Sequence, residues 1–182
     1  MTTDDAPGTH AGAGRQADGQ VGRPGGRPVL LVCGEPERGD DGAAIAAVAA
    51  LPPAVLARVD TVRCGQLDVD HLLAVPDGAR CIVVDAAVGV APGEIVAIPL
   101  ADLADRAGGG TPRSSHALPP DQVIGLAAAL RGRPPEGVFV GIGGRAFGLG
   151  AGLSPDVAAA LPRLVDRLID EILRTGTGLQ PT

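Results

Sequence analysis

Three polar side chains in this sequence are placed so that together they could hold a divalent metal ion. Asp41 follows the apolar run "PVLLVC", Asp85 comes at the end of the apolar run "RCIVVD", and His116 lies in "RSSHALPPD", just before an expected helix. Carboxylates and an imidazole are suitable ligands for divalent metals, and three protein ligands leave a coordination position for water or substrate. The residue types therefore predict an open metal site.

The expected strands explain how two of these residues could meet. In an open doubly wound sheet the first strand lies between the second and the third, and ligands bind where the strand order reverses. Asp41 and Asp85 would then converge on one crevice at the carboxyl ends of the strands. Asp85 is the harder of the two to explain as a structural residue, since a carboxylate after so apolar a run is costly without a partner.

A purely structural interpretation of each residue is also open at this point. Asp40 would be a helix N-cap, Asp41 a favourable charge in the first turn, Asp85 a turn residue and His116 a residue of a surface loop. Capping and helix-dipole effects explain acidic residues at helix starts without any ligand.

The glycine spacing after the first strand raises the possibility of a nucleotide site. Gly34 and Gly39 are spaced like the glycines of a phosphate-binding loop. Asp40 and Asp41 stand where that loop has lysine and a hydroxyl residue, and two negative charges at a helix start would repel phosphate. The stretch "CGEPERGDD" therefore favours a cation.

Hydrophobic periodicity predicts a β-α-β-α-β order followed by further elements, which is typical of an α/β domain. We expect a three-layer αβα fold with a mostly parallel twisted sheet of about five strands and one antiparallel edge strand, which forms a hairpin with the strand before it. The segment 102–115 is expected to be a mobile loop. The expected strands are Pro28–Cys33, Val59–Cys64, Arg80–Val88, Glu94–Leu100 and Gly137–Ile142, and the expected helices lie at 41–51, 67–75, 119–130 and from Pro155 onward.

The domain organisation follows from composition. Residues 1–27 contain almost no large apolar side chains and are predicted to be a disordered tail. Residues 28–175 are predicted to form a single domain, and 176–182 a flexible C-terminus.

Charge and composition exclude several classes of function. The 182 residues carry a formal net charge of −6 and include two Phe but no Tyr or Trp, which argues against binding to nucleic acid through a basic surface or aromatic stacking. Cys33, Cys64 and Cys81 form no C-x-x-C pair, which favours a reducing compartment. No apolar run has the length of a membrane span, so a cytoplasmic location without membrane insertion is expected.

Several motifs taken together resemble those of the hydrogenase maturation endopeptidases, which process the large subunit of [NiFe] hydrogenases. The resemblance covers nearly all of 29–173 and is carried by "LVCGEPERGDDGAAIAAVAAL", "CIVVDAAVGVAPGEIVAIPL", "SSHALP", "VFVGIGG" and "GLSPDVAAALPRLVD". It implies that Asp41, Asp85 and His116 bind nickel, which the substrate could supply, and that the partner is a large-subunit precursor whose C-terminal extension is removed.

The chain departs from the family pattern around these residues. Glu35 stands where the family usually has Asn, "RCGQ" replaces Asp-Gly-Gly-Thr, and the loop 143–152 lacks the usual Pro and acidic residues. These differences predict a divergent member with a different hydrogenase partner.

Two catalytic arrangements fit the predicted site. In one, a bound ion polarises the scissile carbonyl or a water, with Asp40 or Glu35 as the base. In the other, nickel already held by the precursor is the recognition handle, which would explain the absence of an H-E-x-x-H motif.

Two rivals use the chain differently. Cys64 or Cys33 could be a nucleophile with His116 as its base, making the protein a cysteine hydrolase. Alternatively, the protein could be a metal-dependent binding module or assembly chaperone that keeps the site without cleaving.

Overall fold

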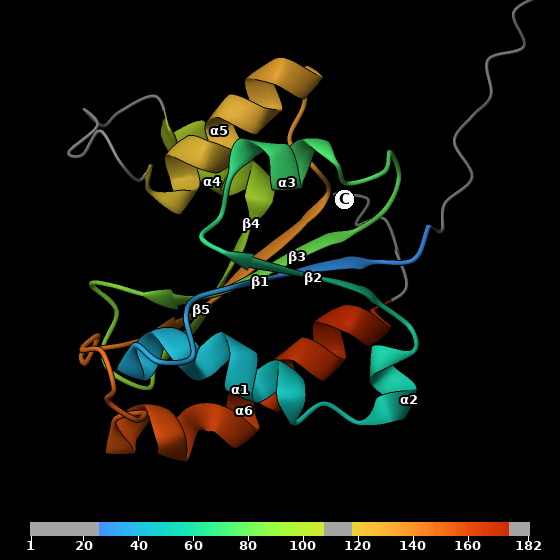
Figure 1. The fold of residues 1–182 in the computed structure, drawn as a ribbon. Helices are drawn as coiled ribbons and strands as arrows, with labels where there is room; N and C mark the ends of the chain where they lie inside the picture. Colours follow the sequence, from blue (N-terminus) through green and yellow to red (C-terminus); the bar gives the residue numbers. More distant parts are fainter. Residues whose placement is uncertain (1–25, 108–117, 175–182) are drawn as a thin grey trace, which may run out of the picture.

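A five-stranded sheet forms the centre of the protein, whose computed structural model describes residues 26–107 and 118–174. The strand order is β2-β1-β3-β5-β4, so β1 lies between β2 and β3 as predicted (Figure 1). The first four strands in this order run parallel and β4 is antiparallel at the edge. The strands are β1 (Val29–Cys33), β2 (Asp60–Gly65), β3 (Cys81–Ala87), β4 (Ile95–Pro99) and β5 (Gly137–Gly143).

Helices cover both faces of the sheet. Figure 1 shows α1 (Ala43–Ala49), α2 (Pro53–Leu56) and α6 (Pro155–Leu173) below the sheet, and α3 (Val69–Leu73), α4 (Leu100–Arg106) and α5 (Pro120–Arg131) above it. A short 3-10 helix, η1 (Gly39–Gly42), leads from the turn after β1 into α1. The predicted three-layer αβα fold is confirmed.

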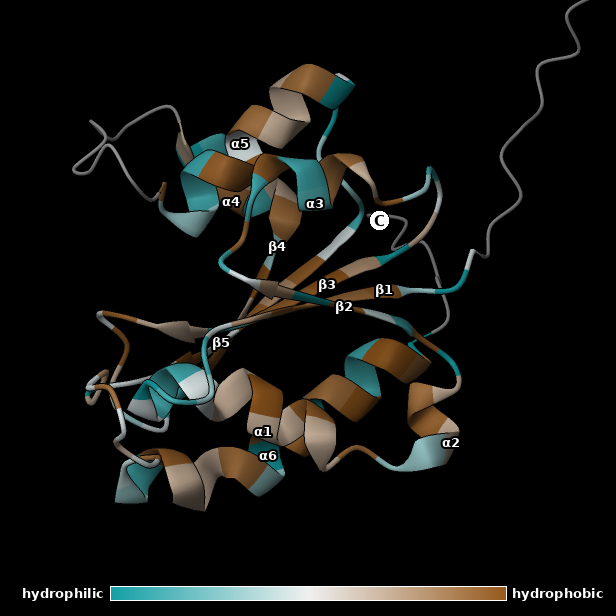
Figure 2. Cartoon of the chain, viewed as in Figure 1, coloured by the Kyte–Doolittle hydropathy of each residue, from teal (hydrophilic) through white to brown (hydrophobic). Residues whose placement is uncertain are grey.

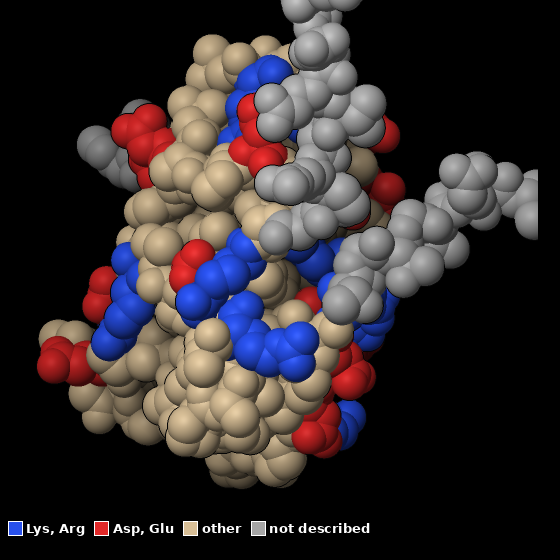
Figure 3. All heavy atoms as spheres, turned by 90° about the vertical axis from the view of Figure 1, so that its right-hand side faces the viewer, with Lys and Arg blue, Asp and Glu red and all other residues tan. Residues whose placement is uncertain are grey.

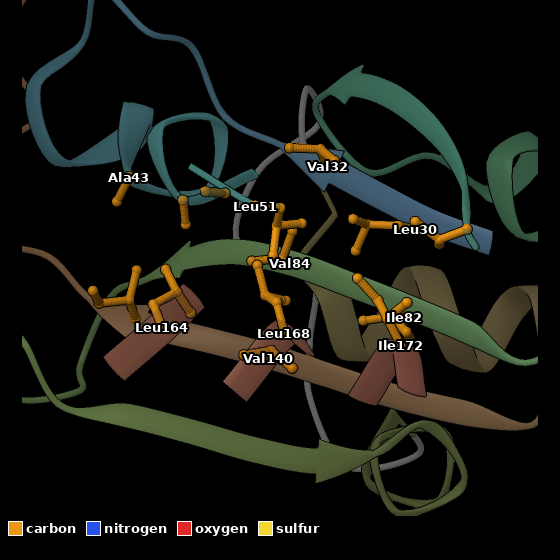
Figure 4. Close-up of a cluster of buried hydrophobic side chains, with 14 of the residues drawn as sticks. Leu30, Val32, Ala43, Leu51, Ile82, Val84, Val140, Leu164, Leu168 and Ile172 are labelled. Atoms are coloured by element: carbon orange, nitrogen blue, oxygen red, sulfur yellow. The ribbon is translucent and has the colours of Figure 1, made fainter. Parts of the chain in front are cut away.

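Alternation along the buried strands divides the interior into two cores. Leu30, Val32, Ile82 and Val84 pack toward α1 and α6, together with Leu164 and other residues of α6 (Figure 4). The intervening residues of the same strands pack toward α3, α4 and α5. Figure 2 shows the corresponding apolar colouring through the central strands. Burial on both faces explains why these strands are continuous apolar runs.

The predicted hairpin between β3 and β4 is wrong. β4 pairs with β5 in an antiparallel register that places Ile95 opposite Ile142. β3 already pairs with β1 on one side and with β5 on the other, so neither edge of β3 is free for β4. The expected antiparallel edge strand is present, but its neighbour is β5, which comes later in the sequence.

The predicted loop at 102–115 is partly wrong, because its first residues belong to α4. Leu100 and Leu103 of this helix are buried against the sheet, and the i, i+3 spacing places them on one helix face. Glycines and polar residues further along made the whole segment resemble a loop. Residues 108–117 lie outside the described residues.

The final helix follows the prediction with one difference. Ser154 occupies the N-cap position and Pro155 begins α6, but the Ser154 side chain makes no capping hydrogen bond. The helix continues through Pro162. In the segments 26–107 and 118–174, no helix combines the length and the apolar character needed to cross a bilayer. The boundaries predicted for the N-terminal tail (1–27), the domain (28–175) and the C-terminus (176–182) stay predictions.

Candidate active site

Asp41 is held at the carboxyl edge of the sheet by the turn that follows β1. Its Oδ2 accepts a hydrogen bond from the backbone N–H of Glu35, with 2.8 Å between the two atoms. Gly34 permits this turn because its φ is 98°, and a Cβ there would collide with the backbone carbonyl of Asp41. Gly34, whose spacing resembles that of a phosphate-binding loop, therefore lets the chain turn so that the Asp41 carboxylate lies near the end of β1.

Asp85 lies in the neighbouring strand, β3, directly after Val84, which pairs with Val32 near the end of β1. Burial raises the pKa of the Asp85 carboxyl to about 7, and the negative charge of Asp41 acts in the same direction, although the N–H of Ala86 donates to Oδ1 at 2.8 Å and opposes the rise. The strand order thus places Asp41 and Asp85 at the same edge of the sheet, and the charge of Asp41 contributes to the raised pKa of Asp85.

The carboxylate pair suits a divalent cation. Two like charges at a partly buried position are unfavourable to each other, and a cation near both would relieve the repulsion and favour the ionised form of Asp85. Carboxylate oxygen is an acceptable donor for nickel together with imidazole nitrogen. The proposed third ligand, His116, lies outside the described residues, and within 26–107 and 118–174 no three His, Cys, Asp or Glu side chains are grouped to hold a metal.

Asp40, predicted as a catalytic residue or base, is completely buried and faces the loop between β5 and α6. Its Oδ2 accepts hydrogen bonds from the N–H groups of Arg145 and Ala146, both at 2.9 Å, and its Oδ1 accepts one from Ser154 N–H at 2.6 Å. Burial alone would raise the pKa of this carboxyl, but the hydrogen bonds from Arg145, Ser154 and Ala146 outweigh it and lower the pKa. These contacts favour a structural role for Asp40, and its role as a base stays a prediction.

Glu35, the other candidate base, is exposed in the turn after β1, and its side chain lies near the last residue of β2. Its Oε1 is close to Gly65, where a Cβ would lie 3.0 Å from that oxygen. Gly65 also has a φ of 61°, which favours glycine. The Glu35 side chain therefore lies beside the glycine of the unusual "RCGQ" sequence, a proximity that sequence alone did not indicate.

The two thiols proposed as nucleophiles differ in their surroundings. Cys33 is buried at the end of β1, and its pKa is raised by its hydrogen bond with Cys64 and by burial. Cys64 is half-buried at the end of β2, and its pKa is lowered because Cys33 hydrogen-bonds to it. The third thiol, Cys81, is buried at the start of β3, and burial raises its pKa to about 12. Cys64 is therefore the better nucleophile of the pair.

The opposite end of the sheet carries an ion-pair network. The carboxylate of Glu171 on α6 is buried and pairs with Arg80, Arg167 and Arg174. Figure 3 shows the face of the molecule on the side where the parallel strands begin. Basic and acidic side chains are intermingled on it. The three arginines supply the counter-charges that the buried Glu171 carboxylate needs at this end of the sheet.

Comparison with known proteins identifies the protein family that has this fold. A family model described as "Hydrogenase maturation protease" matches residues 53–171, and the chain belongs to this family. Its members are peptidases, so the protein is placed among the hydrolases. None of the curated proteins matches the chain.

Solved structures agree on the fold. The hydrogenase maturating endopeptidase HybD from E. coli is 20% identical, with a TM-score of 0.61 over 78% of this chain and 89% of that one. The [NiFe] hydrogenase maturation protease HybD from Thermococcus kodakarensis is 25% identical, with a TM-score of 0.55 over 78% of this chain and 96% of that one. The predicted family is confirmed, at an identity that fits a divergent member.

Proposed function

We propose that this protein is an endopeptidase that removes the C-terminal extension of a nickel-loaded [NiFe] hydrogenase large-subunit precursor. Membership of the maturation protease family supports the reaction class. The observation that carries the proposal is the pairing of Asp41 with Asp85 at the carboxyl edge of the sheet, where burial and like charge favour uptake of a cation. Asp41, Asp85 and His116 are proposed as the nickel ligands.

In this proposal nickel belongs to the substrate and serves as its recognition handle. Asp41 is oriented by the N–H of Glu35, and Asp85 is fixed at the end of β3 between two neighbouring strands. Binding the same ion from two rigid elements would fix the position of the adjacent peptide bond, which is how orientation lowers a reaction barrier. The ion itself would supply polarisation of the scissile carbonyl or of a water molecule.

The test compares two preparations of the same precursor, one loaded with nickel and one nickel-free. The protein should shorten the nickel-loaded precursor and leave the nickel-free precursor intact, with intact mass as the measurement. Equal cleavage of both preparations would contradict the role of nickel as a handle. An unchanged mass for both, while the protein binds the loaded precursor, would instead support a non-cleaving assembly chaperone.

The lowered pKa of Cys64 supports a second candidate, a cysteine hydrolase with His116 as the base. The Cys64 thiolate would attack the scissile carbonyl, and the peptide C–N bond would break to leave an acyl-enzyme while the C-terminal extension departs as an amine that takes its proton from His116. Water would then hydrolyse the acyl-enzyme. A covalent adduct between the protein and its substrate, absent from Cys64→Ser, would favour this candidate over the metal-directed one.

A further inference from the structure

We infer that Asp40 is a positioning residue that fixes the loop 144–154 against the turn carrying Asp41, and that this loop is a specificity element for the substrate. The inference rests on the proposed function, since the substrate in question is the precursor. It assigns to Asp40 a task different from proton transfer.

Three hydrogen bonds join the Asp40 carboxylate to the loop. Both oxygens of Asp40 are used, and their three donors are backbone N–H groups at the two ends of one loop, in Arg145 and Ala146 and again in Ser154. Three backbone hydrogen bonds hold a buried carboxylate in one orientation. Because Asp40 is buried and its bonds all go to the loop, its side chain is directed at the loop and not at a substrate.

Backbone contacts between the same two segments reinforce the link. The N–H of Asp40 donates to the carbonyl of Ala146 at 2.7 Å, that of Gly39 to Ala151 at 3.1 Å, and that of Gly150 to Glu37 at 2.7 Å. Gly39 has a φ of 62°, and a Cβ there would collide with the carbonyl of Ala146. The loop and the turn are thus built to approach more closely than side chains would allow.

The loop 144–154 lies beside both chain segments of the proposed site. Asp40 is the direct neighbour of Asp41, so displacement of the loop would be transmitted to the turn that aims the proposed nickel ligand. On its other side the loop is joined to the last residue of β3, because Gly144 N–H donates to the carbonyl of Ala87 at 3.2 Å. The loop therefore connects the two chain segments that carry Asp41 and Asp85.

The loop also presents an apolar side chain that the fold does not use. Leu149 is 78% exposed, and Val88, in the turn after β3, is 84% exposed. Both belong to connections that leave the carboxyl edge of the sheet, the edge of the proposed site. Since binding energy from parts of a substrate remote from the scissile bond helps to orient it, exposed apolar residues here fit an apolar segment of the precursor's C-terminal extension.

The experiment measures kcat and KM for nickel-loaded precursor with wild type, Asp40→Asn and Leu149→Asp. Asparagine keeps the shape of the side chain but turns an NH₂ group toward N–H donors. Both variants should raise KM by about tenfold or more, while Leu149→Asp leaves kcat within about twofold. In Asp40→Asn the amide hydrogens of Arg145, Ala146 and Ser154 should also exchange faster with solvent.

Two matched controls remove the same groups away from the loop. Asp77→Asn removes a carboxylate that pairs with Arg131 of α5, and Leu130→Asp changes another exposed leucine, at the far end of α5. Both should keep the wild-type KM.

The outcomes separate the two claims. Wild-type protein that fails to cleave would overturn the proposed function. Wild-type cleavage with an unchanged KM in Leu149→Asp, or undisturbed exchange at the loop amides of folded Asp40→Asn, would overturn this inference alone. If Asp40→Asn does not fold, Leu149→Asp still decides whether the loop contacts the substrate.

Discussion

The Oδ2 atom of Asp41 lies 2.8 Å from the backbone nitrogen of Glu35, and this hydrogen bond across the turn after β1 orients the proposed ligand. The same turn contains Asp40, whose carboxylate points the other way, into the loop after β5. Two adjacent aspartates thus have separate tasks: Asp40 holds the loop after β5, and Asp41 lies with Asp85 at the carboxyl edge of the sheet.

Nickel binding tests the proposed ligands directly. Calorimetric titration of wild type should show one site, and Asp41→Ala, Asp85→Ala and His116→Ala should each weaken it by at least about tenfold, since each removes one of three ligands. Asp156→Ala is the control for loss of a nearby exposed carboxylate and should bind like wild type. Wild-type affinity in all three variants would show that the site lies elsewhere.

The stability of the metal-free protein should depend on pH through Asp85. The pKa of this carboxyl is about 7 in the folded protein and about 3.8 in the unfolded chain, so between these values only the folded state keeps the proton. Its contribution to the free energy of unfolding therefore falls as pH rises from about 4 to about 7, by up to about 4 kcal/mol. Asp85→Asn lacks this carboxyl.

Urea denaturation at pH 5 and pH 8, in the presence of a chelator, measures this difference. The variant Asp85→Asn should be more stable than wild type at pH 8 and have a smaller advantage at pH 5. An advantage of equal size at both pH values would show that Asp85 is ionised in the folded protein throughout.

Removal of the Asp40 carboxylate should destabilise the protein substantially. Asp40→Ala leaves three backbone N–H groups without their acceptor in a buried position, for which a loss of about 3 kcal/mol in the free energy of unfolding is expected. Asp156→Ala should cost less than about 1 kcal/mol, because that side chain is half-exposed. Similar urea midpoints for the two variants at pH 7 would contradict the structural role of Asp40.

The contribution of Asp40 to the free energy of unfolding should depend on pH in the opposite direction from that of Asp85. Because the folded state lowers this pKa, the stabilisation is present above the ordinary carboxyl range and is lost as pH falls through the lower folded value. The stability gap between wild type and Asp40→Asn should therefore narrow as pH is lowered below about 4. A gap that stays constant down to pH 2 would mean that the hydrogen bonds do not depend on the charge.

Sequence patterns predicted the central fold because it depends on short-range signals. Continuous apolar runs indicated β1 and β3, and the strand order then brought Asp41 and Asp85 to one edge. The position of β4 could not be predicted in this way, since it depends on which edges are free after all strands have paired. α4 was missed because a short helix with two buried leucines gives little periodicity beside a glycine-rich segment.

The task of Asp40 was also beyond the reach of sequence patterns. Its partners are backbone N–H groups more than a hundred residues away, and any residue other than proline provides such a group. An aspartate before the first helix looks the same whether it caps that helix, binds a metal or holds a distant loop. The proximity of Glu35 to Gly65 was hidden for a similar reason, because it joins the turn after β1 to the end of β2.

The thiols should be dispensable if metal-directed recognition is correct. Alkylation of folded protein should modify the half-buried Cys64 before the buried Cys33 and Cys81, because access and a lowered pKa favour Cys64. Cys64→Ser should retain at least about half of the wild-type cleavage rate. Loss of cleavage in Cys64→Ser, with nickel binding intact, would instead favour the cysteine hydrolase.

The central claim is that this protease shortens its substrate through the Asp41, Asp85 and His116 site, and the most direct measurement is the intact mass of nickel-loaded large-subunit precursor after incubation. Wild-type protein should lower that mass by one C-terminal fragment, and Asp41→Ala, Asp85→Ala and His116→Ala should leave it unchanged. A precursor that keeps its full mass with wild type, or is shortened equally by all three variants, would contradict the account.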